Sequence, residues 1–279
     1  MRSITSSGLS CNMDATKEIN KLLSSYAYNS GHDFAQVFDN WLDWMIGWFD
    51  TDLIRKRGCD YPSIMDDMKA DNETFYECFS LVAKDTAWHI EQKGWYDAFG
   101  SLYEDKVKSG YKASSMGQFF TPDSLCDAMA GIVIDSTKTP FLYDPCCGSG
   151  RLLLASYGKL DKEKFHYFIA GDLDAISCKM CSLNMMLHGM FGIVERRDAL
   201  TMEFFSGYVI NEMCYPFPVA TPTIRRTDEV GCRKNLAFAR SIAPKKEDRS
   251  DCGVAVKIEA PSKKDEEPRQ LSLFNLDEL

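Results

Sequence analysis

The segment Asp144-Pro145-Cys146-Cys147-Gly148-Ser149-Gly150 decides the fold of this chain. It follows a short apolar run, Phe141–Tyr143, and precedes a helical stretch at 151–160. Glycines at such a turn let the backbone approach a ligand closely, and the N-terminus of the following helix favours an anionic group. The third glycine of a dinucleotide fingerprint is missing, which makes a nicotinamide or flavin site a weak prediction. A Walker loop is excluded, because no Gly-Lys-Ser/Thr follows.

Strand-like and helix-like stretches alternate after this segment. Apolar runs typical of strands occur at 165–170, 191–194 and 208–210, and a helical stretch lies at 175–188. This alternation predicts a parallel sheet covered by helices. Upstream, Thr121 is placed to cap a helix that starts at Pro122. The apolar face of that helix is expected to consist of Leu125, Met129, Ile132 and Val133.

The N-terminal third has helical periodicity. Apolar residues between Phe34 and Phe49 recur at positions i, i+3, i+4 and i+7, and a second stripe runs from Phe75 to Ile90. A small helical bundle is the inference. We therefore expect four regions: a helical domain (1–110), an α/β cofactor-binding domain (111–240), a disordered linker (241–269) and a C-terminal tail (270–279).

Composition narrows the class of protein. The chain has 279 residues, of which 45% are hydrophobic and 26% charged, as in an ordinary globular protein. No apolar run approaches the length of a membrane span, and residues 1–14 show no apolar core of a secretory signal. Eleven cysteines without a visible signal predict reduced thiols in a cytoplasmic protein.

Charge is unevenly distributed along the chain. The net charge of −9 argues at first against a DNA-binding surface, but residues 1–110 carry −7 of it and residues 111–240 are neutral. The segment 225–240 is locally basic. We favour a solvated loop there over a phosphate contact.

Two acidic residues end later strands of the predicted sheet. Asp172 lies 22 positions after Gly150, a spacing that suits a carboxylate accepting hydrogen bonds from ribose hydroxyls. Asp198 follows the next strand and could accept a hydrogen bond from an adenine amino group. Each acid alone is more often a cap at the end of a strand. In order on one parallel sheet, they indicate an adenosine-containing ligand that lacks a pyrophosphate.

An ordered set of short motifs resembles the N-6 adenine DNA methylases, and most closely the modification subunits of type I restriction–modification systems. The resemblance covers about residues 95–211. Its motifs are Phe99–Glu104, Gly117–Pro122, Asp144–Gly150, Gly171–Asp174, Asn184–Gly189 and Arg197–Leu200. Within this set, Asn184 and His188 are one helical turn apart, and we favour helix packing and capping as their role.

The resemblance implies an α/β fold, with an S-adenosylmethionine-dependent, Rossmann-like methyltransferase domain preceded by a small helical domain. It implies S-adenosylmethionine as the cofactor and adenine N6 in DNA as the substrate. It also implies a role for each matching residue. Phe120, Thr121 and Pro122 would lie against the cofactor, Asp144, Gly148 and Gly150 would surround its methionine part, Asp172 would hold the ribose, and Asp198 the adenine edge.

The chain departs from the family pattern where methyl transfer takes place. The family has Asn/Asp-Pro-Pro-Tyr/Phe after its fourth strand, whereas this chain continues Asn211-Glu212-Met213-Cys214-Tyr215-Pro216-Phe217. Asn211 falls at the position of the catalytic amide, and Tyr215 or Phe217 could supply the aromatic that stacks on the extruded base. The site is remodelled or decayed, and we favour decay. Residues 212–240 are too few for three further strands with their crossovers, so an incomplete sheet is expected.

The last ten residues are apolar again. Gln270-Leu271-Ser272-Leu273-Phe274 matches the pentapeptide by which many bacterial proteins bind the replication sliding clamp. In that mode Leu271, Leu273 and Phe274 would fill an apolar pocket. The alternative is a tail folded back on its own domain, where it could cover an open sheet edge.

Two main hypotheses follow for the function. The first is an enzyme that methylates adenine N6 in DNA, with a specificity or completing partner chain supplying what is absent. The second is a degenerate binding module that retains the fold and is recruited to the sliding clamp. Methylation of a substrate other than DNA is a third. Residues 211–217 are the feature that separates the first two.

Overall fold

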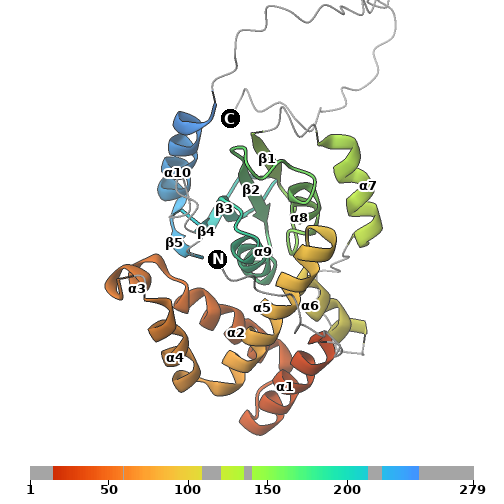
Figure 1. Ribbon diagram of the computed structural model, residues 1–279, viewed down its shortest axis with the longest axis vertical. Coiled ribbons are helices and arrows are strands. Elements are labelled where there is room, and N and C mark those ends of the chain that lie inside the picture. Colours follow the sequence, from red (N-terminus) through yellow and green to blue (C-terminus); the bar gives the residue numbers. More distant parts are fainter. Residues whose placement is uncertain (1–14, 59, 109–120, 135–139, 213–221, 245–279) are drawn as a thin grey trace, which may run out of the picture. The chain divides into compact units, whose positions relative to one another are not determined.

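The computed structural model describes residues 15–58, 60–108, 121–134, 140–212 and 222–244. Four groups of predicted residues therefore lie outside the described residues: Phe120, Tyr215, Phe217 and the tail 270–279. Within 15–244 the structure has a helical part and an α/β part (Figure 1). Among the described residues, no helix combines the length and apolar character needed to cross a bilayer.

The first part is helical, as the periodicity predicts, and has six helices among the described residues. They are α1 (Ala15–Ser30), α2 (Phe34–Trp48), α3 (Thr51–Lys56), α4 (Tyr61–Asp71), α5 (Glu73–Lys93) and α6 (Ala98–Lys108). Side-chain caps begin three of them: Asp33 accepts from the amide of Gln36, Asp50 from that of Asp52, and Asn72 from that of Phe75. The predicted stripe of α2 is buried, with Trp41 and Leu42 fully inaccessible.

The second part is a five-stranded sheet with flanking helices. Its strands are β1 (Phe141–Asp144), β2 (Tyr167–Asp172), β3 (Gly192–Arg197), β4 (Phe204–Ile210) and β5 (Ile224–Thr227), in the spatial order β1-β2-β3-β4-β5. Its helices are α7 (Asp123–Val133), α8 (Arg151–Tyr157), α9 (Ala175–Leu187) and α10 (Glu229–Ile242). This confirms an α/β fold preceded by a helical region.

The prediction that every strand is parallel was wrong. β1, β2 and β3 are parallel, but β4 runs antiparallel to β3 and β5 antiparallel to β4. Six residues, 198–203, join β3 to β4. A parallel connection needs a dozen residues or more, so a turn this short reverses the chain direction.

The sheet is buried on both faces. Along β2, Phe168 and Ala170 belong to the core shared with α8, α9 and the helical part. Tyr167 and Ile169 alternate with them and face a second core that includes Cys232 and Ala239 of α10. This period of two is the geometry of a pleated strand between two layers.

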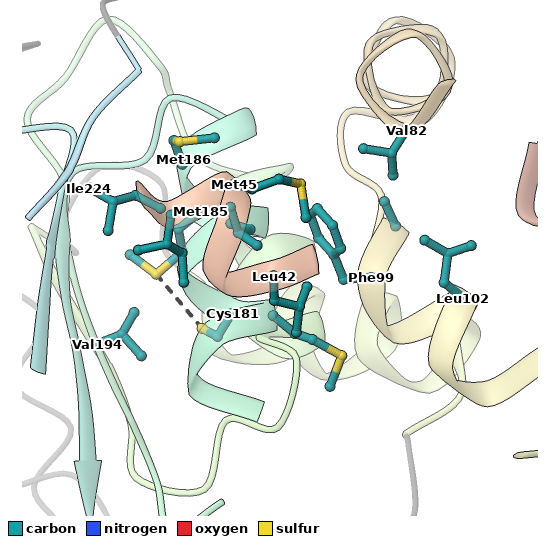
Figure 2. Close-up of a cluster of buried hydrophobic side chains, with 14 of the residues drawn as sticks. Leu42, Met45, Val82, Phe99, Leu102, Cys181, Met185, Met186, Val194 and Ile224 are labelled. Carbon is teal, nitrogen blue, oxygen red and sulfur yellow. Dashed lines mark hydrogen bonds between the residues drawn. The ribbon is translucent and has the colours of Figure 1, made fainter. Parts of the chain in front are cut away.

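Helix α2 joins the helical part to the sheet through α9. Figure 2 shows Leu42 and Met45 of α2 beside Cys181 and Met185 of α9. At the rim of this contact, the Lys179 ammonium lies 2.6 Å from the Asp39 carboxylate and 2.7 Å from that of Asp43. The two parts of the described chain therefore share one hydrophobic core.

Two local predictions need correction. Helix α7 begins one residue later than expected, with Pro122 as its cap, and it buries Cys126 and Ala130 in place of the predicted face of larger residues. Small residues allow α7 to pack closely on α8. The basic segment 225–240, expected as a solvated loop, forms β5 and α10, and α10 continues through Ile242.

Candidate functional site

Three carboxylates lie at the carboxyl ends of the parallel strands. Asp144 ends β1 and is in register with Ala170, two residues before Asp172 on β2. Asp172 is in register with Arg196, two residues before Asp198 beyond β3. The three acids therefore lie together at the carboxyl ends of β1, β2 and β3, which we call the acidic edge. Each later acid lies two residues beyond the position that is in register with the previous acid. The structure brings these three predicted residues to the same edge.

The glycine turn, residues 145–150, connects β1 to α8 and contacts β2. Gly148 and Gly150 adopt left-handed backbone conformations, with φ of +55° and +89°. A side chain at Gly150 would also meet the Cys181 sulfur at 2.8 Å. The Cys147 amide donates to the Gly171 carbonyl at 2.8 Å, which fixes the turn on β2. The left-handed backbone favours glycine at both positions, and the nearby Cys181 sulfur adds a steric reason at Gly150.

Asp172 connects β2 to this turn. Its Oδ2 accepts a hydrogen bond from the Gly148 amide at 2.8 Å, and its Oδ1 accepts one from the Asp174 amide at 2.9 Å. A carboxylate offers about four acceptor positions. Each oxygen therefore keeps capacity for a further donor, such as a pair of vicinal hydroxyls.

Asp144 adds a second carboxylate at the turn. Burial raises the pKa of the Asp144 carboxyl, the backbone amide of Cys146 lowers it, and the neighbouring Asp172 carboxylate raises it further. Among the described residues, no Lys, Arg or His forms an ion pair with either acid. Two neighbouring carboxylates without a cation form a local negative field that favours a positively charged ligand group.

Asp198 has a structural role in addition to its place on the edge. Its Oδ1 accepts hydrogen bonds from the amides of Leu200 (2.8 Å) and Thr201 (3.2 Å). These two bonds lower the pKa of the Asp198 carboxyl. The residue thus stabilises the turn that reverses the chain between β3 and β4.

A buried polar network connects the glycine turn to the helical part and to α9. At its centre is Asp97, which is 1% exposed and precedes α6. Its Oδ2 accepts from Ser149 Oγ (2.6 Å) and Arg151 Nε (2.7 Å), and its Oδ1 accepts from the Gly100 amide and Asn184 Nδ2. Three of these four bonds connect the helical part to the turn, to the start of α8 and to α9, and the fourth caps α6 itself.

Arg151 extends the network towards α7. It donates to Glu104 at 2.9 Å and to the Thr121 carbonyl at 3.0 Å. Burial lowers the pKa of the guanidinium, but the carboxylates of Asp97 and Glu104 outweigh this effect and raise it. Of the predicted cofactor loop, the described residues Thr121 and Pro122 are thus held beside the glycine turn.

Asp97 and Arg151 were not among the predicted site residues. The motif Phe99–Glu104 pointed to the correct helix, but Asp97 lies two positions before it. A buried carboxylate 52 positions away from Ser149 leaves no periodic signal in the sequence. The sequence signal for this network is Asn184, which belongs to a matched motif. Its Nδ2 donates to both the Asp97 carboxylate and the Ser149 carbonyl.

The predicted role of His188 in capping is confirmed. His188 is the C-cap of α9, and its Nδ1 lies 2.7 Å from the Asn184 carbonyl. Its Nε2 accepts from the Tyr96 amide at 3.1 Å. This pair of partners requires the neutral ring with its proton on Nδ1. Burial lowers the pKa of His188 to about 4.

Asn211 lies at the other end of the sheet. Because β4 is antiparallel, its carboxyl end meets the amino end of β3, where Ile210 is in register with Gly192. β3 separates this position from the acidic edge by six residues, or about 20 Å. The structure therefore does not bring the predicted catalytic amide together with the carboxylates.

The contacts of Asn211 are those of a fully buried connector. Its Nδ2 lies 3.0 Å from the Met190 carbonyl and 3.2 Å from that of Met186, and its Oδ1 accepts from the Thr223 amide at 3.0 Å. It adopts a φ of +54°, which asparagine tolerates better than most residues. Asn211 thus joins the end of α9 to the β4–β5 connection.

The chain is similar to known proteins over more than half of its length. The model of the N-6 DNA Methylase family matches residues 95–246. The type I restriction enzyme MpnII methylase subunit of Mycoplasma pneumoniae is 32% identical over 142 residues, which are 47% of this chain and 26% of that protein. The MjaIX methylase subunit of Methanocaldococcus jannaschii is 24% identical over 132 residues, covering 45% of this chain and 22% of that protein.

Other similarities are of the same kind. The type II methyltransferase M.MamI of Microbacterium ammoniaphilum is 26% identical over 111 residues, which are 33% of this chain and 31% of that protein. A type I restriction-modification methyltransferase subunit from Streptococcus thermophilus matches in structure with a TM-score of 0.35 and 17% identity, over 67% of this chain and 55% of that one. The chain spans about a quarter of the length of the first two relatives. With more than half of its residues matched by the family model, the chain belongs to the N-6 DNA methylase family.

Proposed function

We propose that the acidic edge of β1–β3 binds S-adenosylmethionine, and that the chain takes part in methylation of adenine N6 in DNA. The observation that carries this proposal is the Asp172 carboxylate, which is fixed by Gly148 and Asp174 and has acceptor capacity left on both oxygens. A ribose with two free hydroxyls matches that capacity. No cation of the described residues pairs with the adjacent Asp144, which therefore suits the positively charged methionine part.

Each residue of the edge has a separate part in this proposal. Gly148 and Gly150 let the backbone approach the ligand, and Thr121 and Pro122 border it from the start of α7. Asp172 would hold the ribose. The Asp198 carboxylate, whose Oδ1 is used by the turn, would accept from the adenine amino group. The bound cofactor would supply an electrophilic methyl group.

We place methyl transfer itself outside the described residues. Adenine N6 has a lone pair conjugated with its ring, so an enzyme must extrude the base, stack it on an aromatic and accept hydrogen bonds from its amino group. Asn211 is about 20 Å from the acidic edge, and Tyr215 and Phe217 lie outside the described residues. Methyl transfer, which we propose to take place in the cytoplasm, therefore needs catalytic groups from outside the described residues. We propose that a specificity or completing partner chain supplies them.

Calorimetric titration with S-adenosylmethionine tests the binding step. We expect binding by the parent chain and an affinity at least about tenfold lower for Asp172→Ala. Asp161→Ala is the matched control, because Asp161 also caps a turn through a backbone amide but lies in the loop before β2. Equal affinities for the parent and Asp172→Ala would contradict the proposed site.

Transfer of labelled methyl groups to unmethylated DNA tests the second step. Transfer by the chain alone or with a specificity subunit supports the enzyme. Cofactor binding without transfer to any DNA supports the degenerate binding module. Transfer to RNA or protein alone would favour the third hypothesis. Absence of both binding and transfer would overturn the functional proposal.

A second candidate function rests on the tail sequence. Gln270-Leu271-Ser272-Leu273-Phe274 would recruit the chain to the bacterial sliding clamp. In a pull-down with purified clamp, Leu273→Ala/Phe274→Ala should abolish retention, because both side chains would fill the apolar pocket. Equal retention of the parent and the double variant would contradict this function.

A further inference from the structure

The two outer strands of the sheet differ in what lies beside them. Residues of the helical part hold β5: the Ile224 amide donates to the Phe49 carbonyl at 2.8 Å, and the Arg226 guanidinium lies 2.8 Å from the Asp43 carboxylate. β1 is the other outer strand, and among the described residues only β2 pairs with it. An outer strand with unpaired backbone groups is a template for another strand. β1 is therefore the side at which this sheet can be extended.

The backbone of β1 directs two residues away from β2. The Pro140 carbonyl accepts a hydrogen bond from the Tyr167 amide at 2.7 Å, so the backbone of Pro140 faces β2. Successive residues of a strand direct their backbone groups to alternate sides, and Leu142 therefore also faces β2. The amides and carbonyls of Phe141 and Tyr143 face outward, where no strand in the described part of the chain meets them.

The side chains of β1 are apolar on both faces of the sheet. Phe141 and Tyr143 pack against the core on the α10 side, and both remain partly exposed. Leu142 belongs to the core on the α8 and α9 side. A strand beside β1 would thus meet apolar side chains on both faces, as the inner strands of a sheet between two layers do.

Helix α7 adds apolar surface at the same end of the sheet. Figure 1 shows α7 on the β1 side of the sheet and α10 on the β5 side. Cys126 and Ala130 of α7 are buried, and larger apolar residues at neighbouring positions around the helix remain exposed. These residues, which we call the α7 patch, are Leu125 (49% exposed), Met129 (38%), Ile132 (85%) and Val133 (58%). A strand edge and an apolar patch are therefore both uncovered at this end of the described structure.

We propose that β1 pairs with β1 of a second copy of the chain, so that two sheets join across a two-fold axis. Identical strand edges related by such an axis run antiparallel, and each residue meets its counterpart reciprocally. With Leu142 at the axis, Phe141 of one copy lies opposite Tyr143 of the other. The outward amides and carbonyls of these residues then form about four hydrogen bonds between the copies. The same pairing brings the Phe141 and Tyr143 rings together across the strands, which is a favourable aromatic pair.

Charge and the state of the two outer strands favour a second copy as the partner. Most of the net charge of −9 lies in residues 1–110, whereas residues 111–240, which contain β1 and α7, are neutral. Two copies can therefore approach each other at this end without strong repulsion. Because the helical part holds β5, a contact through β1 alone is complete with two copies and does not continue into a filament.

The extent of the contact sets its expected strength. A four-residue strand edge and the α7 patch offer on the order of a few hundred Å² on each copy, less than the roughly 800 Å² of a stable interface. We therefore expect a weak dimer, with a Kd of about 1–100 µM. The contact uses the side of β1, so the acidic edge at the ends of the strands stays open. Dimer formation does not depend on whether that edge binds S-adenosylmethionine.

Sedimentation velocity of the full chain, over a concentration range of about 1–200 µM, tests the proposal. Tyr143→Pro removes one outward amide and leaves the bonds to β2 in place, and Ile132→Asp puts a charge into the α7 patch. We expect a reversible dimer of the parent chain and a Kd at least about tenfold higher for each variant. Val230→Asp, at a 55% exposed apolar residue of α10, is the matched control and should leave the Kd unchanged.

Hydrogen exchange of the parent chain locates the contact. The amides of β1 should exchange at least about threefold more slowly at the highest concentration than at the lowest. A monomer at every concentration would overturn the proposal. Equal dimerisation of the parent and both variants would overturn it too, because another surface would then join the copies. If circular dichroism shows that Tyr143→Pro does not fold, the Kd of Ile132→Asp decides alone.

One further outcome concerns the chain itself. Slow exchange of the β1 amides that does not change with concentration would mean that a segment of the same chain covers this edge. That result would overturn the dimer as well.

Discussion

The two ends of the sheet carry polar residues in opposite roles. At the carboxyl ends of β1–β3, Asp144 and Asp172 keep hydrogen-bonding capacity beyond the bonds they accept from described residues. At the amino end of β3, Asn211 and the nearby His188 direct their side chains to backbone groups of the protein. Strand direction makes this difference, because it decides which end of the sheet a residue after a strand will reach.

The largest expected effect concerns the anchor of the carboxyl edge. Asp97→Ala should lower the free energy of unfolding by about 3–5 kcal/mol, because it leaves the buried Arg151 guanidinium without its main partner. Urea denaturation measures this. Asp67→Ala is the matched control, since Asp67 is 45% exposed and its pair with Arg57 should contribute less than about 1 kcal/mol. Similar losses in both variants would mean that the buried network is not special.

The amino end should respond to pH. The pKa of His188 is lowered to about 4, so the folded protein keeps the ring neutral while the unfolded chain takes up a proton near pH 6.5. The stabilisation is fully present above pH 6.5 and is lost as the pH falls towards 4, by about 3 kcal/mol in total. His188→Gln should remove this part of the pH dependence in urea melts at pH 7, 5.5 and 4.5. Parallel curves for parent and variant would contradict a buried neutral ring.

Asn211→Ala separates structure from binding. Loss of its hydrogen bonds to Met190, Met186 and Thr223 should cost about 2–3 kcal/mol of unfolding free energy, because these backbone groups stay buried. Affinity for S-adenosylmethionine should not change in the folded variant. Asn29→Ala, at an exposed residue of α1, is the control for stability. Lower affinity for S-adenosylmethionine with an unchanged free energy of unfolding would show that Asn211 takes part in the cofactor site.

The smallest effect is expected for Asp198. Asp198→Ala should weaken binding of S-adenosylmethionine about threefold, less than Asp172→Ala, because one of its oxygens already serves the turn. Calorimetry with the Asp161→Ala control measures it. An effect larger than that of Asp172→Ala would place the main contact of the ligand on β3.

The sequence predicts the acidic edge well and the rest of the site poorly. Strand-end acids and positive-φ glycines have local signals, so Asp144, Gly148, Gly150 and Asp172 could be placed from residue type and spacing. The chain reverses after Asp198 because the connection 198–203 is short. The predicted parallel sheet did not take this length into account and placed Asn211 at the carboxyl ends of the strands, whereas it lies at the opposite end of the sheet. On α7, apolar periodicity identified one face but could not tell which side is buried, because small residues formed the inner one.

The network around Asp97 has a consequence for how the molecule assembles. Its carboxylate joins residues that are 52, 54 and 87 positions away along the chain. Such contacts require the closure of long loops, so we expect the glycine turn to reach its final shape late in folding. A ligand that recognises the finished turn would act on the folding equilibrium of both parts, by about 2.7 kcal/mol at a hundred times its dissociation constant. Thermal unfolding of the helices would then report on occupancy of the sheet edge.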